Sequence, residues 1–241
     1  MISKLWHKLL SFAICFILLN CESKKENLTS VSNQTVNMPH FNFLALGDSY
    51  TIGESVCDTC RWPAQLKSAL ENNIENSEID LSIIAQTGWT TTNLINAIND
   101  ASPGSDNDLV TLLIGVNNQY QQKPFSLYEN EFVALLNTAI AKASGNKTKV
   151  IVVSIPDYAF TPFGQAMANP SQITTDLIAY NAFAENYCAE NGIDFVNITD
   201  ITQEGLNDPN LVATDDLHPS NQAYALFVER ILPVAQSKLG Y

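Results

Sequence analysis

Apolar and polar positions along the chain follow two alternating patterns, short apolar runs and longer stretches of helical spacing. The apolar runs are bounded by glycine, proline or polar residues, which is typical of strands. They cover 41–46, 79–85, 109–114, 150–155 and 193–196. Between and after them, apolar residues recur every third or fourth position, which predicts amphipathic helices. These helical stretches are 63–73, 93–99, 129–143, 173–191 and 221–239.

Alternation of strands with helices predicts a parallel sheet that is covered by helices on both faces. We therefore expect one α/β domain over residues 39–241, a three-layer, doubly wound, flavodoxin-like fold with a five-stranded parallel sheet. Ligands of such sheets bind beyond the carboxyl ends of the strands. Because Ser49, Gly88 and Asn117 follow the first three strands, we expect them at one edge of the sheet.

The N-terminal segment resembles a bacterial lipoprotein signal. Two lysines precede the apolar run 9–19, which is the pattern of a signal peptide and is too short to span a bilayer comfortably. The run ends at Leu-Leu-Asn-Cys, with Asn20 where a small residue usually stands. The resemblance implies a signal peptide over 1–20, a lipid on Cys21 and a location in the bacterial cell envelope. Plain secretion and an uncleaved anchor are the alternatives.

Residues 21–38 are polar and cannot bury a core, so we expect a flexible tether there. The net charge of −13 becomes −15 once the two lysines leave with the signal. No basic stripe is present, which argues against a nucleic-acid partner. An acidic chain is also repelled by anionic lipid, so we expect membrane contact only through the N-terminal lipid. We expect a monomer.

Cys57 and Cys60 form a C-x-x-C pair, which can be a zinc half-site, a redox pair or a small disulfide. No second C-x-x-C completes a zinc site, and the pair does not directly follow a strand as a redox motif does. In an exported protein we favour a disulfide, with free thiols or a thiol-redox function as alternatives.

Two short polar clusters, each just past a strand-like or apolar stretch, supply a serine, a histidine and a carboxylate. The chain has three histidines; His7 lies in the signal and His40 precedes the first strand, which leaves His218 as the candidate general base. Asp215 lies three residues before it and can hold its far ring nitrogen. With Ser49 as nucleophile, these are the three parts that a serine hydrolase needs.

Four motifs occur in the order that is typical of one enzyme family. They are Gly47-Asp48-Ser49, the glycine of Gln86-Thr87-Gly88, Gly115-Val116-Asn117-Asn118 and Asp215-x-x-His218-Pro219. In this the chain resembles the SGNH, or GDSL-type, esterase and lipase family across almost all of 41–220. The resemblance implies an oxyanion hole made by the N–H groups of Ser49 and Gly88 and the side-chain amide of Asn117. Asn118 departs from the family, which has Asp there, and we expect tuning of the site rather than loss.

The resemblance implies a carboxylic-ester hydrolase (EC 3.1.1) that works through an acyl-serine intermediate, without a metal or another cofactor. The substrate candidates are lysophospholipids, short acyl esters and O-acetylated sugars. We expect Thr51 to Arg61 and Tyr158 to Asn169 to line the acyl side, with packing in the core as the alternative role of their apolar residues. Trp89, Tyr120 and Phe125 could instead stack on a sugar. The alternative function is a catalytically silent ligand-binding surface lipoprotein on the same scaffold.

Overall fold

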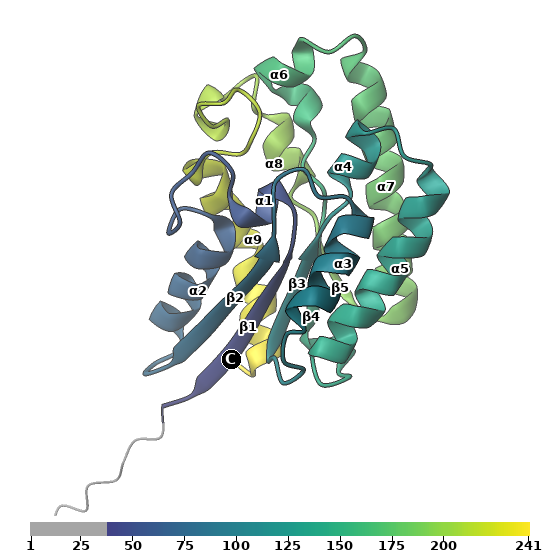
Figure 1. Cartoon of the computed structure of the whole chain (residues 1–241). Helices are drawn as coiled ribbons and strands as arrows, with labels where there is room; N and C mark the ends of the chain where they lie inside the picture. Colours follow the sequence, from purple (N-terminus) through teal and green to yellow (C-terminus); the bar gives the residue numbers. More distant parts are fainter. Residues whose placement is uncertain (1–37) are drawn as a thin grey trace, which may run out of the picture. The chain divides into compact units, whose positions relative to one another are not determined.

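Five parallel strands form one sheet that runs through the middle of the domain (Figure 1). The computed structural model describes residues 38–241. The strand order is β2-β1-β3-β4-β5, and every neighbouring pair is parallel. The chain is thus a single α/β domain with the expected flavodoxin-like sheet. The strands are β1 (His40–Gly47), β2 (Glu78–Ala85), β3 (Leu109–Leu113), β4 (Val150–Val153) and β5 (Asp194–Val196).

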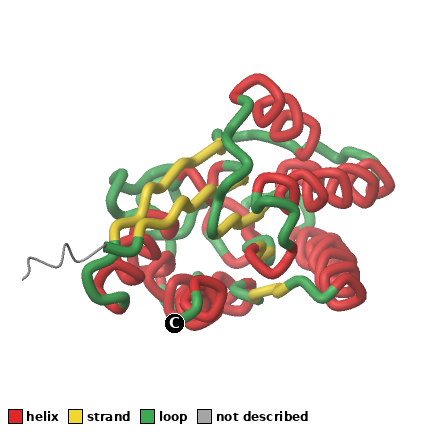
Figure 2. Tube along the Cα trace, turned by 90° about the horizontal axis from the view of Figure 1, so that it is seen from below, coloured by secondary structure: helices red, strands yellow, loops and turns green. Residues whose placement is uncertain are grey.

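Helices cover both faces of this sheet. α2 (Trp62–Asn73) packs with α9 (Asn221–Leu239) on one face, and α3 (Thr91–Ala101), α5 (Phe125–Lys142) and α7 (Pro170–Asn191) pack on the other (Figure 1). Seen along a perpendicular direction, the strands lie between two groups of helices, which gives the three layers (Figure 2). The shorter elements are α1 (Ser49–Ile52), α4 (Val116–Tyr120), α6 (Pro162–Gln165), α8 (Thr199–Gln203) and the 3₁₀ turns η1 (Lys147–Lys149), η2 (Tyr158–Phe160) and η3 (Pro209–Leu211).

The predicted strands and long helices are all present, and they differ mainly at their ends. α5 begins at Phe125, four residues before the predicted start, because Pro124 precedes it and Phe125 and Tyr128 add apolar positions to the buried face. α3 begins at Thr91 because Thr90 caps it: its side chain accepts from Asn93 N–H, and the Asn93 side chain accepts from Thr90 N–H. The short helices α1, α4, α6 and α8 were not predicted, since four or five residues carry too little periodicity.

The core is made of the apolar strand residues together with aromatic side chains from the helices. Leu44 and Leu112 of the central strands are fully buried, as is Trp62 at the start of α2. Between α5 and α7, the rings of Tyr128 and Tyr180 lie 4.4 Å apart. Burial of such side chains contributes roughly 1.5–3 kcal/mol each, so the core holds the carboxyl ends of the strands rigidly in place for the loops that follow them.

Candidate active site

Ser49 lies in a sharp turn at the carboxyl end of β1, as the first residue of α1. Asp48 caps this short helix: its Oδ1 accepts from the Tyr50 N–H at 3.1 Å. As the first helical residue, Ser49 has no acceptor for its own N–H within the helix. Its side chain is almost buried, with 4% exposure. The turn therefore fixes both the hydroxyl and a free backbone donor at the edge of the sheet.

His218 and Asp215 lie together in the loop before α9. His218 Nδ1 and Asp215 Oδ2 are 2.5 Å apart, and Asp215 Oδ1 accepts from the backbone N–H groups of Leu217 and His218. The bond at Nδ1 leaves Nε2 as the nitrogen that is free to act as a base. The loop is closed behind the histidine, since Ala213 N–H donates to the His218 carbonyl at 2.7 Å.

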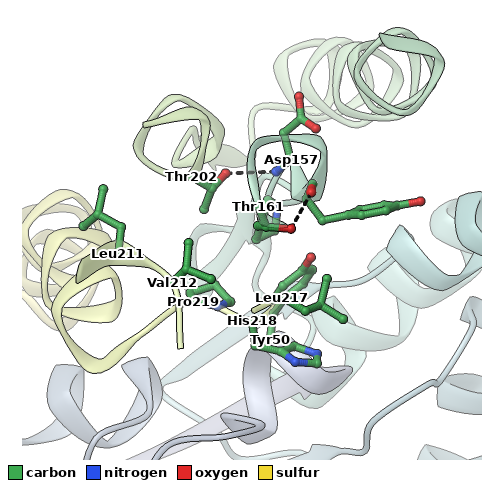
Figure 3. Close-up of a pocket in the computed structure, with 11 residues that line it drawn as sticks. Tyr50, Asp157, Thr161, Thr202, Leu211, Val212, Leu217, His218 and Pro219 are labelled. Atoms are coloured by element: carbon green, nitrogen blue, oxygen red, sulfur yellow. Dashed lines mark hydrogen bonds between the residues drawn. The ribbon is translucent and has the colours of Figure 1, made fainter. Parts of the chain in front are cut away.

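Apolar side chains support the histidine from behind. Its ring packs edge-on against Tyr50, with centroids 5.8 Å apart. Leu211, Val212 and Pro219 stand around the same loop, as Figure 3 shows. The hollow between them is only about 10 Å³, enough for roughly one water. This packing fixes the ring and leaves no room for a ligand behind it.

A third group holds Asp215. Ser55 Oγ donates to Asp215 Oδ2 at 2.6 Å, although 160 residues separate them in the chain. Partial burial would raise the pKa of Asp215, but the hydrogen bonds from Ser55, from the His218 ring and from two backbone N–H groups lower that pKa to about 2. The carboxylate thus stays charged at neutral pH. Sequence reasoning missed Ser55, because no local pattern indicates a contact of this range.

Ser49 and His218 line the same cavity, which has a volume of about 320 Å³. Gly88 and Asn117 line it as well, so the residues predicted at the first three strand ends share this cavity with His218. Within residues 38–241, no hydrogen bond joins Ser49 Oγ to the His218 ring. Such contacts are often long without substrate and tighten when it binds.

Gly88 and Asn117 present donors at the cavity wall. Gly88 has a φ of +84°, a conformation that favours glycine, and an added Cβ would meet no protein atom within 4 Å. A side chain there would project into open space rather than into the protein. Asn117 Nδ2 donates to the Trp89 carbonyl at 3.0 Å, which fixes the orientation of the amide and leaves its second N–H free. Within the described residues, the Gly88 N–H donates to no other group.

Asn118, which we expect to tune the site, does not itself line the cavity. Its side chain is fully buried; Oδ1 accepts from Thr91 N–H at 2.9 Å, and Nδ2 donates to Thr91 Oγ1 at 2.6 Å. Thr91 Oγ1 in turn donates to Glu131 of α5. Asn118 therefore joins α4 to the start of α3. Its amide can accept and donate at the same time, which matches Thr91, since Thr91 offers an N–H donor and a hydroxyl oxygen as acceptor.

The loop from Thr51 to Arg61 does not line the cavity of Ser49 and His218, which corrects the sequence prediction. It braces the site instead. Besides the bond from Ser55 to Asp215, Glu54 accepts a hydrogen bond from Thr87, the residue before Gly88. Cys57 and Cys60 are joined by a disulfide within this loop. The loop thus connects the turn of Gly88 with the loop of Asp215.

The other expected substrate contacts are divided between two cavities. Tyr158 and Phe163 line the cavity of Ser49 and His218, together with Tyr120. Tyr120 and Tyr158 also line a second cavity of about 530 Å³, which Phe125 and Met167 border. Phe160 faces neither of them. Trp89 is partly buried against the core and lines neither cavity; its backbone carbonyl accepts from Asn117 Nδ2.

Among residues 38–241, one cluster has the geometry of a metal site. It consists of His40, Glu78 and Asp80, all exposed, at the amino ends of β1 and β2. Ser49 lies at the carboxyl ends of the strands, so this cluster is not part of the cavity.

No helix in the described part of the chain is long and apolar enough to cross a membrane. The predicted signal peptide 1–20, the predicted lipid site Cys21 and all but the last residue of the predicted tether 21–38 lie outside the described residues.

Comparisons with known proteins agree with this arrangement. The family model for the GDSL-like lipase/acylhydrolase family matches residues 45–226. A search of curated proteins gave no match. Among solved structures, a lipolytic GDSL-family protein from Veillonella parvula is similar, with 19% identity, a TM-score of 0.63, and coverage of 81% of this chain and 98% of that one.

Two esterases of known structure are similar as well. The psychrotrophic esterase EstA from Pseudoalteromonas has 16% identity and a TM-score of 0.61, with 83% of this chain and 100% of that one covered. A variant of the acetyl xylan esterase Axe2 from Geobacillus stearothermophilus has 17% identity and a TM-score of 0.61, with 81% and 94% covered. At these identities the likeness shows the shared fold. With the family model spanning most of the domain, the chain belongs to the GDSL-like lipase/acylhydrolase family of ester-bond hydrolases.

Proposed function

We propose that this protein is a serine esterase that hydrolyses carboxylic esters through an acyl-serine intermediate. One observation carries the proposal: Ser49 and His218 line the same cavity, while Nδ1 of that histidine is held by Asp215 at 2.5 Å. A nucleophile from the first strand end thus meets a base and an orienting carboxylate from a loop near the other end of the chain. The family match supports the same reaction class.

The first half of the reaction forms the acyl-enzyme. Ser49 Oγ attacks the ester carbonyl carbon, and its proton moves to His218 Nε2. The negative charge on the carbonyl oxygen is stabilised by the N–H groups of Ser49 and Gly88 and by Asn117 Nδ2. The tetrahedral intermediate then breaks its bond to the alcohol oxygen. The alcohol leaves with the proton from His218, and the acyl group stays on Ser49.

Water completes the reaction. His218 takes a proton from a water molecule as its oxygen attacks the acyl carbon, and the same oxyanion donors stabilise the second intermediate. When the bond to Ser49 Oγ breaks, the serine recovers its proton from the histidine and the carboxylic acid leaves. Asp215 keeps its negative charge throughout and stabilises the imidazolium, which its pKa of about 2 supports.

The alternative of a catalytically silent binding protein is not favoured, because the chain keeps all three residues of the proposed triad. Ser49 and His218 line one cavity, and Asp215 is hydrogen-bonded to His218. The deciding assay is hydrolysis of p-nitrophenyl acetate, butyrate and octanoate by the protein and by its Ser49→Ala variant. We expect turnover by the parent and loss on the order of 10³-fold or more in the variant. Equal rates in the two proteins would exclude Ser49 as the nucleophile.

We further propose that the protein is anchored in the bacterial cell envelope through a lipid on Cys21. The apolar run before this cysteine and the polar segment after it support the proposal. Labelling of expressing cells with a radioactive fatty acid tests it. The parent should incorporate label, whereas a Cys21→Ser variant should not. Label in both proteins would mean that the lipid is attached to a residue other than Cys21.

A further inference from the structure

The second cavity, of about 530 Å³, adjoins the catalytic cavity. Tyr120 and Tyr158 line both, so a ligand with its ester group at Ser49 can extend from one into the other. The second cavity lies between the end of α4 and the start of α7, and Figure 1 shows these elements and α6 at the same end of the domain. Its volume falls within the range of ligand pockets, roughly 300–1,000 Å³.

A chain of polar side chains is fixed along the wall of this cavity. Tyr158 OH donates to Gln119 Oε1 at 2.8 Å, and Gln119 Nε2 donates to Asp176 Oδ2 at 3.0 Å. Gln172 Nε2 donates to the other oxygen, Asp176 Oδ1, at 2.8 Å. A carboxylate offers about four acceptor positions, and each amide nitrogen has a second N–H. Acceptors and donors therefore remain available in fixed orientations.

Aromatic surfaces stand beside these polar groups. Tyr120 is 47% exposed and lies edge-on to Tyr158, with centroids 6.2 Å apart. Phe125 and Tyr180 border the same cavity. The face of an aromatic ring carries partial negative charge and attracts the polarised C–H groups of a flat ligand. The cavity thus combines ring faces with hydrogen-bonding groups that both donate and accept.

The charges in the cavity select against several kinds of ligand. One cation, Lys123, and one anion, Asp176, line it, so that it favours neither a plain anion nor a plain cation. An alkyl chain would displace water from the carboxylate and the amides without replacing their hydrogen bonds, which is unfavourable. A neutral ligand with several hydroxyl groups and apolar C–H faces satisfies both kinds of surface. Saccharides have this chemistry.

We propose that the second cavity binds the alcohol part of the ester and that this alcohol is a neutral saccharide. The inference rests on the proposed esterase activity, and it narrows the substrate to an O-acylated sugar. Asp176 and Gln119 accept from and donate to the hydroxyl groups, and Tyr120 packs on a face of the ring at the boundary of the two cavities.

The test uses three esters with the same acetyl group: p-nitrophenyl acetate, acetylcholine and a monoacetylated methyl glucoside. The measured quantity is the ratio of kcat/KM for the glucoside ester to kcat/KM for p-nitrophenyl acetate. We expect Asp176→Asn to lower this ratio about ten-fold or more, mainly through KM, as loss of a hydrogen bond to a charged group does. Tyr120→Ala should lower it too. The matched control is Asp100→Asn, an exposed site on α3 that should leave the ratio unchanged.

A correctly folded Asp176→Asn variant with an unchanged ratio would overturn the proposal. Preference of the parent for acetylcholine over the glucoside ester, lost in the same variant, would overturn it in favour of a cationic headgroup. If the parent hydrolyses none of the three esters and neither p-nitrophenyl butyrate nor octanoate, the esterase proposal fails separately. Binding of methyl glucoside to the parent, followed by saturation-transfer NMR, then decides: a signal weakened in Asp176→Asn supports the saccharide site, and no signal refutes it.

Discussion

Asp48, the neighbour of the proposed nucleophile Ser49, has a fully buried carboxyl group. Oδ1 accepts from Tyr50 N–H, and Oδ2 has no hydrogen-bond partner among the described residues. Burial raises the pKa of Asp48 to about 7, and the backbone N–H groups of Tyr50, Asp48 and Gly115 offset only part of this effect. The ordinary value is 3.8. The folded protein therefore holds this proton more tightly than the unfolded chain does.

The sign and size of the effect on stability follow from this difference. A carboxyl group with a raised pKa binds more protons in the folded state, so the free energy of unfolding falls as pH rises from about 4 to about 7. At about 1.4 kcal/mol per pKa unit, a rise of roughly three units corresponds to about 4 kcal/mol. A side-chain amide does not ionise, so we predict that Asp48→Asn removes this fall. The variant should match the parent near pH 4 and exceed its stability by up to about 4 kcal/mol above pH 7.

Urea unfolding at several pH values between 4 and 8.5, followed by circular dichroism, measures this difference. The difference between the two proteins isolates Asp48, because Asp200 and Asp215, whose pKa values are lowered, contribute equally to both. Asp100→Asn on the surface of α3 is the matched control and should follow the parent at every pH. Parallel curves for Asp48→Asn and the parent would refute the reasoning, since they would mean that Asp48 is ionised in the folded protein across this range.

Two further substitutions test the walls of the site. Asn117→Ala removes one of the proposed oxyanion donors, so we expect kcat to fall on the order of 10²–10³-fold with little change in KM; a fall in kcat/KM caused by KM alone would assign the side chain to substrate binding instead. Asn118→Asp restores the family residue, but in this chain two carboxylates, at position 118 and at Glu131, would then compete for the one hydroxyl hydrogen of Thr91. We expect the free energy of unfolding, measured with heat or urea, to fall by about 1–3 kcal/mol. We expect no gain in kcat. An unchanged free energy of unfolding would show that the Thr91 side chain changes its rotamer and partners.

The sequence by itself determined the order of strands and helices and the edge at which the site forms. Strand and helix periodicities are local properties, and they predicted the long elements to within a few residues. In a parallel sheet every strand ends at the same edge, so motifs after β1, β2 and β3 had to converge there. Spacing alone also favoured the pair of Asp215 and His218, which lie three residues apart in one loop.

Only the tertiary structure decided what surrounds that edge. Ser55 reaches Asp215 across 160 residues, Asn118 turns toward α3, and the loop from Thr51 to Arg61 braces the site without lining it. Burial of Asp48 likewise depends on the strands and helices packed around it. No local pattern encodes these contacts, because each depends on which loops from distant segments come to lie side by side once the sheet and its helices have packed.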